Sequence, residues 1–84
     1  MISPYLTIDL KKIEHNARTI VALCRDHGIH VSGVTKAVCG NPEIAQAMLR
    51  GGVESIADSR FENIERMQQA GIDVPYILLR LPPL

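Results

Sequence analysis

The chain has 84 residues, of which 46% are hydrophobic and 21% are charged, and this composition is typical of an ordinary globular protein. Nine basic side chains balance nine acidic ones, so no excess positive charge is available to bind a nucleic-acid backbone, and we expect no nucleic-acid partner. The longest apolar runs are far shorter than the ~20 residues of a membrane-spanning helix, and the first residues lack the pattern of a signal peptide, so we expect a cytoplasmic protein with no membrane partner.

The first half of the chain alternates between strand and helix patterns. Residues 5–9 are predicted to form a strand, and residues 11–27 a helix that Gly28 ends. A second strand is predicted over residues 29–35, followed by a turn at 36–40. The apolar residues of the first helix recur at intervals of three and four, which predicts one buried face. These residues are Leu10, Ile13, Ala17, Ile20, Val21 and Cys24.

The second half repeats this alternation. The stretch Asn41-Pro42-Glu43 has a capping side chain, a proline at the first helical position and an acid in the first turn, so it predicts a helix start. That helix should end at Gly51-Gly52, and a short strand is predicted over residues 53–57.

A third helix and a fourth strand complete the pattern. Asp58 or Ser59 is expected to cap the third helix, because the stretch from Ser59 to Glu62 fits a capping box. Its apolar face is expected to consist of Phe61, Ile64 and Met67, and Gly71 to end it. Residues 76–81 form a nearly continuous apolar run, as in a parallel strand that is covered on both sides.

Strands that alternate with helices in this way indicate an α/β fold with a parallel sheet and right-handed crossovers. Three helices are too few to cover both faces of such a sheet, and a full (β/α)8 barrel needs ~250 residues. We therefore expect residues 1–84 to be the N-terminal fragment of a TIM-type barrel, with about three βα units and a fourth strand. A complete small α/β domain is the alternative.

Functional residues of parallel sheets lie at the carboxyl ends of the strands, and here Lys36 follows the second strand directly. Alternation places Ser32, Val34 and Lys36 on one face, with the lysine at the open end. A partly desolvated lysine is a nucleophilic amine that can form a Schiff base. A lysine at a strand end is also commonly just solvated, so position alone leaves both interpretations open.

Other polar residues near the strand ends are weaker candidates. Arg80 ends the fourth strand and is a candidate for binding a substrate or cofactor anion, with a solvated side chain as the alternative. Asp58 is interpreted as a helix cap rather than a chemical group. Cys24 and Cys39 are expected to be free thiols, and no histidine has metal-ligand spacing with them, so no metal site is predicted.

Several motifs resemble the alanine racemase family. The stretch Tyr-Leu-Thr-Ile-Asp-Leu-Lys-Lys-Ile-Glu-His-Asn over residues 5–16 resembles its opening strand and helix, and Val-Thr-Lys-Ala at 34–37 resembles its cofactor-lysine motif. The ornithine racemase-like branch is similar over residues 33–45, and also at 51–53, 57–60 and 77–82. Classical alanine racemases carry a tyrosine after the lysine motif, whereas this chain has Ala-Val-Cys-Gly at 37–40, which favours the ornithine-type branch.

The resemblance implies a pyridoxal 5'-phosphate (PLP)-dependent amino-acid racemase of the barrel fold. Lys36 would hold PLP as a Schiff base and act as the general base on one face of the substrate. The resemblance also implies that the phosphate-binding loops and a second catalytic base, a tyrosine from the partner subunit of a dimer, lie outside these residues. The chain alone is therefore expected to be inactive and to self-associate through its fourth strand.

Two other functions stay open at this point. A PLP-homeostasis protein shares the barrel and the lysine but has no racemase activity. A structural α/β fragment would leave Lys36 idle and bind no PLP. The side chain of the amino-acid substrate is not specified by these residues.

Overall fold

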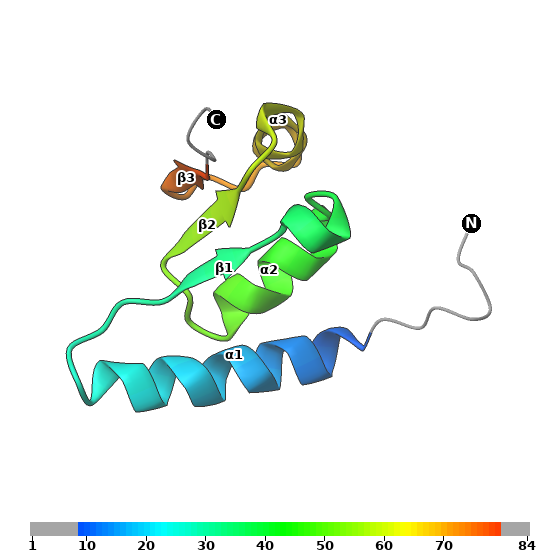
Figure 1. Cartoon of the computed structure of the whole chain (residues 1–84). Coiled ribbons are helices and arrows are strands. Elements are labelled where there is room, and N and C mark those ends of the chain that lie inside the picture. The colour runs from blue at the N-terminus through cyan, green and yellow to red at the C-terminus, as the bar shows by residue number, and fades with distance from the viewer. Residues whose placement is uncertain (1–8, 80–84) are drawn as a thin grey trace.

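The computed structural model describes residues 9–79, which form alternating helices and strands (Figure 1). In chain order the elements are α1 (Leu10–Arg25), β1 (Ser32–Val34), the 3-10 helix η1 (Lys36–Val38), α2 (Pro42–Arg50), β2 (Ser55–Asp58), α3 (Phe61–Gln69) and β3 (Tyr76–Leu78). The strand expected at residues 5–9 lies outside the described residues, except for Asp9. The expected alternation of helices and strands is confirmed.

The three strands form one parallel sheet in the order β1-β2-β3. Gly33 of β1 pairs with Ile56 of β2, and Ile56 pairs in turn with Tyr76 of β3. The chain is therefore an α/β fragment with parallel strands that alternate with helices, as the sequence predicted. The strand arrows in Figure 1 show that β1 and β2 end on the side of the molecule where η1 lies.

Local capping signals fix the starts of the first two helices. The Asp9 carboxylate accepts hydrogen bonds from the backbone N–H groups of Lys11 and Lys12, both at 3.1 Å. The Asn41 side chain caps α2 in the same way through Glu43 and Ile44. Such caps satisfy N–H groups that have no partner inside the helix. The predicted start of α2 is thus confirmed, and α1 begins one residue earlier than predicted.

The start of α3 differs from the prediction. Arg60 occupies the N-cap position of this helix, and its side chain makes no capping hydrogen bond. The Asp58 carboxylate instead accepts a hydrogen bond from the Arg60 N–H, at 2.8 Å. This hydrogen bond forms a turn that ends two residues after Asp58, and the helix begins only at Phe61. The prediction of a capping box from Ser59 to Glu62 is therefore wrong.

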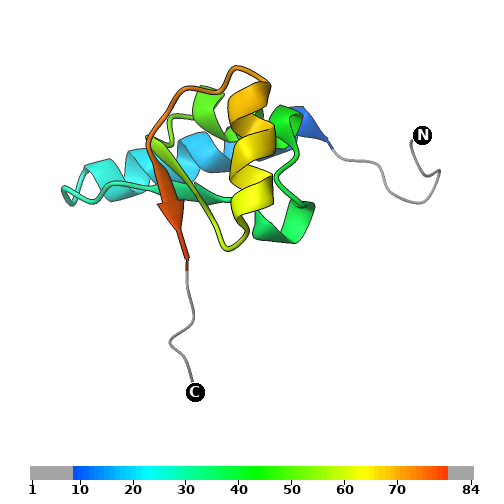
Figure 2. The ribbon, with the colours of Figure 1, turned by 90° about the horizontal axis from the view of Figure 1, so that it is seen from above.

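Helices cover one face of the sheet, and the core lies between them. Figures 1 and 2 show α2 and α3 on the same side of the strands, with α1 packed beyond α2. Strand residues that face these helices are buried, including Gly33 and Ile56, and so is Thr35, which follows β1 on the same side. The buried apolar cluster contains Val21, Ala45, Val53, Ile56, Ile64, Met67 and Ile72. In the part of the chain that the structure describes, no helix is long and apolar enough to cross a membrane.

The other face of the sheet is uncovered by the described residues. Val34 is 44% exposed and Ile77 is 45% exposed, and the smaller Ala57, which is only 3% exposed, lies between them in the pairing register. Leu79 follows on the same face, and the hydroxyls of Ser32 and Ser55 hydrogen-bond across it. We call this set the open face: Ser32, Val34, Ser55, Ala57, Ile77 and Leu79. Leu78, between Ile77 and Leu79 in the chain, points to the other side and packs against the core.

Periodicity misplaced two apolar residues that the sequence assigned to the core. Ile20 is 51% exposed, because α1 directs Val21 at α2 and leaves Ile20 beside β1, at an edge that no other described strand covers. Phe61 is 60% exposed, since it is the first residue of α3, while Ile64 and Met67 of the same helix are buried as predicted.

The strands are shorter than predicted because strand pairing depends on a neighbour as well as on composition. β1 begins at Ser32 rather than at residue 29, and Ile29 is 56% exposed. Its partner β2 begins only at Ser55, so residues 29 and 30 extend past the paired region. The predicted strand 76–81 is observed as Tyr76–Leu78, and its last two residues lie outside the described range.

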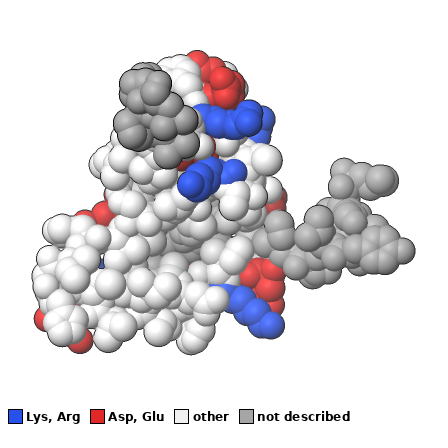
Figure 3. All heavy atoms as spheres, viewed as in Figure 1, with Lys and Arg blue, Asp and Glu red and all other residues white. Residues whose placement is uncertain are grey.

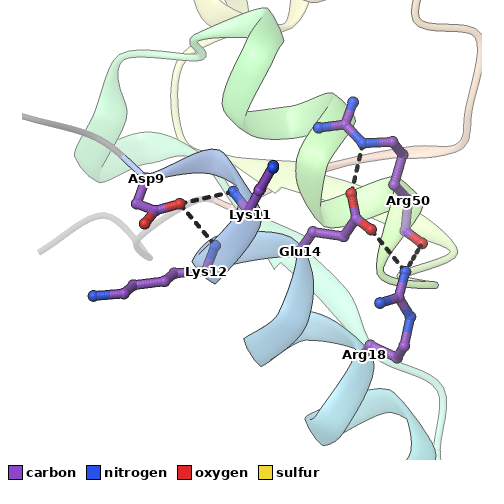
Figure 4. Close-up of polar contacts among 6 residues, drawn as sticks. All are labelled: Asp9, Lys11, Lys12, Glu14, Arg18 and Arg50. Atoms are coloured by element: carbon purple, nitrogen blue, oxygen red, sulfur yellow. Dashed lines mark hydrogen bonds and ion pairs between the residues drawn. The ribbon is translucent and has the colours of Figure 1, made fainter.

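An ion-pair cluster joins α1 to the end of α2 (Figure 4). Arg50 Nε and Arg18 Nη2 each lie 2.8 Å from the Glu14 carboxylate, and Arg18 also donates to the Arg50 carbonyl. The two backbones approach closely here: a Cβ built on Gly51 would lie 2.5 Å from Ala17 Cβ and 2.6 Å from the Glu14 carbonyl oxygen. Glycine at position 51 therefore allows α1 to pack directly on α2.

Candidate functional site

A short turn after β1 carries Lys36 at the carboxyl end of the sheet. The Thr35 carbonyl accepts hydrogen bonds from the N–H groups of Val38 and Gly40, both at 3.1 Å, which closes the turn. Cys39 and Gly40 both have left-handed backbone conformations, with φ of 56° and 64°, and they return the chain to the start of α2. Lys36 begins η1 and its side chain is exposed.

A buried polar cluster lies directly behind this turn. Thr35 Oγ1 donates to Asp58 Oδ2 at 2.7 Å, and the Asn63 side-chain amide donates to both Asp58 oxygens at 3.1 and 3.2 Å. Thr35 and Asp58 are 0% exposed and Asn63 is 5% exposed. We call these three residues the Asp58 cluster. It joins the ends of β1 and β2 to the first turn of α3.

The Asp58 carboxylate is charged although it is buried. Burial raises its pKa, but hydrogen bonds from Thr35, from the backbone N–H groups of Arg60 and Ser59, and from Asn63 lower the pKa by more, so it lies below its ordinary value. The ion pairs among residues 9–79 do not include Asp58. Neutral donors therefore stabilise this charge.

A hollow of about 490 Å³ lies beside the lysine, within the ~300–1,000 Å³ range of small-molecule sites. It is lined by Lys36, Cys39, Arg60, Glu62, Asn63 and Arg66. An Arg66 guanidinium N–H donates to the Cys39 carbonyl, which links α3 to the lysine turn. Three cations and one acid line this hollow, so it favours an anionic ligand. Figure 3 shows basic side chains, with acidic ones beside them, near α3 at the top of the view, while much of the surface below carries no charge.

Lys36, the predicted cofactor lysine, lies at the carboxyl end of β1, as expected. Its side chain is exposed rather than partly desolvated, and Val34 is exposed on the open face. Arg80 lies outside the described residues. Asp58 bonds the Arg60 N–H near the start of α3, yet it also holds Thr35 and Asn63, which sequence reasoning missed.

A signal for this cluster exists in the sequence. Thr35 and Asp58 occupy equivalent positions at the ends of two strands, on the side where alternation also places Gly33 and Ile56 in the core. Polar residues on a buried face need partners, so the sequence indicates that each needs one, and the register of the sheet then shows that they pair with each other. Within residues 9–79 no group of three or more His, Cys, Asp or Glu side chains is placed to hold a metal ion, and both cysteines are free.

Comparison with known proteins identifies the family. Residues 8–84 match the model of the family described as alanine racemase, N-terminal domain, and the chain belongs to this family. It is 44% identical over 82 residues to a lysine racemase of Thermotoga maritima, covering 98% of this chain and 23% of that protein.

Two further relatives carry racemase names. An ornithine racemase of Acetoanaerobium sticklandii is 33% identical over 81 residues, which cover 96% of this chain and 22% of that protein. An alanine racemase of Halalkalibacterium halodurans is 29% identical over 80 residues, which cover 92% of this chain and 21% of that protein. The chain thus spans less than a quarter of the length of the curated relatives it matches.

Proposed function

We propose that this chain is the N-terminal part of a PLP-dependent amino-acid racemase, with Lys36 as the residue that holds the cofactor. Residues 1–84 would supply about three βα units and a fourth strand of a (β/α)8 barrel. One observation carries the proposal: in a chain of the alanine racemase family, an exposed lysine lies two residues after a parallel strand, at the carboxyl edge of the sheet.

The side chains around Lys36 fit such a cofactor. PLP joins an aldehyde to an anionic phosphate, and the hollow offers one primary amine together with the guanidinium groups of Arg60 and Arg66. When bound, PLP withdraws electrons from the Cα of an amino acid and makes its Cα–H acidic. Lys36 Nζ would hold the aldehyde carbon, and after release it would take a proton from one face of Cα.

We further propose a basic amino acid as the substrate, with lysine or ornithine as the specific candidates. The relatives that are 44% and 33% identical are named lysine racemase and ornithine racemase. Both amino acids end in a side-chain amine. The ornithine-type assignment drawn from the missing tyrosine at 37–40 fits this class. Arg80 is retained as a candidate for binding the substrate carboxylate.

The open face supports the proposal that further chain completes the site. Val34, Ile77 and Leu79 leave apolar surface uncovered, and such surface marks contact with other chain segments or subunits. We propose that the parent protein acts as a cytoplasmic homodimer and that the 84 residues alone self-associate and do not racemise amino acids.

The experiment compares the protein that carries this chain, as wild type and as Lys36→Ala. Each form is mixed with PLP, reduced with borohydride and digested, and the labelled peptide is mapped by mass spectrometry. We expect label on Lys36 in the wild type and none on residues 34–41 of the variant. Label elsewhere in the wild type, or no label at all, would contradict the assignment.

Chiral analysis of the products then separates two activities. Wild-type protein incubated with L-lysine or L-ornithine should produce the D-enantiomer, and Lys36→Ala should produce none. PLP binding without racemisation of lysine, ornithine or alanine would instead identify a PLP-homeostasis protein. Racemisation of alanine alone would keep the reaction class and refute the proposed substrate.

A further inference from the structure

We propose that Asp58 is a positioning residue for Lys36, acting through Thr35 and Asn63 to hold the turn that presents the lysine. This inference rests on the proposed role of Lys36. It concerns residues that lie behind the lysine and need not touch cofactor or substrate. Because Asp58 is 0% exposed, its carboxylate acts on the neighbouring chain rather than on a bound molecule.

The first contact fixes the start of the turn. Thr35 precedes Lys36 directly, and all of its polar groups are hydrogen-bonded. Its N–H donates to the Ala57 carbonyl at 3.0 Å, its carbonyl accepts from Val38 and Gly40, and its hydroxyl donates to Asp58. The hydroxyl bond is the one that a change of side chain removes without altering the backbone pattern.

The second contact fixes the end of the turn. A Cβ built on Gly40 would lie 2.6 Å from Asn63 Cβ and 3.0 Å from Asn63 Cα, so the backbone at Gly40 packs directly on Asn63. Asn63 is held in turn by Asp58 through its side-chain amide. Asp58 thus restrains both ends of the turn: Thr35 by a hydrogen bond and Gly40 through packing on Asn63.

The stretch between these ends is otherwise held by a few bonds, among them the hydrogen bond from Asn41 N–H to the Val38 carbonyl at 3.2 Å. Lys36, Ala37 and Cys39 are exposed, and Val38 is half-buried. One further link is the hydrogen bond from Arg66 to the Cys39 carbonyl. The direction in which the lysine leaves the sheet is therefore set by the ends of the turn. Small misplacement of a reacting group costs up to ~100-fold in rate, so this support has a kinetic consequence.

Asp58 is itself anchored to the chain at the end of β3. Its backbone carbonyl accepts a hydrogen bond from the Leu79 N–H at 2.8 Å. The Asp58 side chain also accepts from Arg60 N–H, next to the hollow that Lys36 lines. The position of the lysine is thus coupled to all three strands of the sheet and to the start of α3.

The test uses a matched pair of variants in the protein that carries this chain. Thr35→Val keeps the shape of the side chain and removes the hydroxyl, whereas Thr35→Ser keeps the hydroxyl. We expect Thr35→Val to slow borohydride-trapped capture of PLP at Lys36 by about tenfold or more, and Thr35→Ser to capture at close to the wild-type rate. In steady-state assays the loss in Thr35→Val should fall on kcat more than on KM.

Amide hydrogen exchange gives a readout that needs no cofactor. The Val38 and Gly40 amides donate to the Thr35 carbonyl, so they should exchange faster in Thr35→Val than in Thr35→Ser, while amides of α1 stay unchanged. Asp58→Asn should speed exchange of the same two amides.

The outcomes distinguish this inference from the proposed function. If the wild type captures no PLP at Lys36, the proposed function fails. If the wild type captures PLP and Thr35→Val captures it equally fast with unchanged exchange at Val38 and Gly40, the positioning role alone is overturned. The positioning role is also overturned if Thr35→Ser is slowed as much as Thr35→Val.

Discussion

Two polar clusters centred on carboxylates join distant parts of this chain, and they differ in burial. The Asp58 cluster links Thr35 to Asn63 behind the lysine turn. The Glu14 cluster links Arg18 to Arg50 at the α1–α2 contact. In both clusters hydrogen bonds lower the pKa of the central carboxyl.

The partners of the two carboxylates reverse the usual expectation from charge. Glu14 has two full ion pairs, yet its side chain is 26% exposed and those of Arg18 and Arg50 are 58% and 52% exposed. Asp58 has neutral donors and is 0% exposed. Exposed ion pairs contribute little because water and salt compete with them, whereas unpaired buried donors are costly. The buried contacts with uncharged partners are therefore the stronger link.

The largest expected effect comes from removing the buried carboxylate. Asp58→Ala leaves the Thr35 hydroxyl and the Asn63 amide without their acceptor, and each unsatisfied buried group costs about 1–3 kcal/mol. We expect a loss of about 3 kcal/mol or more in the free energy of unfolding, measured by urea denaturation of the protein that carries this chain. The matched control is Glu14→Ala, and equal losses in the two variants would contradict the conclusion that the Asp58 cluster is the stronger link.

Glycine substitutions test how closely the backbone packs at each of the two clusters. Gly40→Ala combines a left-handed φ of 64° with a Cβ 2.6 Å from Asn63 Cβ, so we expect a loss of about 3 kcal/mol. Gly51→Ala meets α1 at 2.5 Å without a left-handed φ and should cost about 2 kcal/mol.

Gly28→Ala is the control for backbone strain in this series. Its φ is 69° and no atom lies within 4 Å of the new Cβ, so only the conformational cost of about 1 kcal/mol applies. In thermal unfolding, the fall in Tm should be largest for Gly40→Ala, smaller for Gly51→Ala and smallest for Gly28→Ala. A Gly28 variant as damaging as the Gly40 variant would show that packing on Asn63 contributes nothing.

Acid titration should separate the two carboxylates. The ordinary pKa of an aspartate is 3.8, and in the folded protein the pKa of Asp58 is lower than this. The stabilisation from Asp58 is therefore complete above the ordinary pKa, and it is lost as the pH falls through the lower folded-state pKa. We expect Asp58→Asn to flatten the decline of stability below about pH 4, and Glu14→Gln to flatten it less. The measurement is the urea midpoint from about pH 7 to about pH 2, and identical slopes in Asp58→Asn and wild type would contradict this account.

The smallest expected effect is in the Glu14 cluster. Glu14→Gln should lower stability slightly at low ionic strength, and the difference from wild type should disappear in about 1 M salt, where the screening length is ~3 Å. The effect of Asp58→Asn should persist in the same salt, because its contacts are buried. Urea unfolding at two salt concentrations measures both, and a salt-insensitive Glu14 effect would contradict the assignment of this cluster as a weak link.

Local signals in the sequence predicted much of the fold. Asn41-Pro42-Glu43 fixed the start of α2, because its capping bonds lie within three residues. The alternation of apolar segments indicated the α/β class and placed Lys36 after a parallel strand. The ends of the strands were less predictable, because β1 extends only as far as β2 can pair with it.

The cluster behind the lysine could not be derived from local signals. Thr35 and Asp58 are 23 positions apart, and their contact requires the register in which Val34 pairs with Ala57. Periodicity also describes one helix at a time, so it did not show that Ile20 and Phe61 lie beyond the elements they would pack against. Residues that act together across strands need the sheet register before they can be recognised.

The strand order has a consequence for how the polypeptide folds during synthesis. Neighbours in the sheet are also successive strands along the chain, β1-β2-β3. As the chain leaves the ribosome, each new strand can therefore join an edge that already exists, without waiting for a distant segment. Among residues 9–79 the outer edge of β3 has no strand partner, and such an edge can accept a further strand, with the apolar residues Ile77 and Leu79 exposed on the open face beside it.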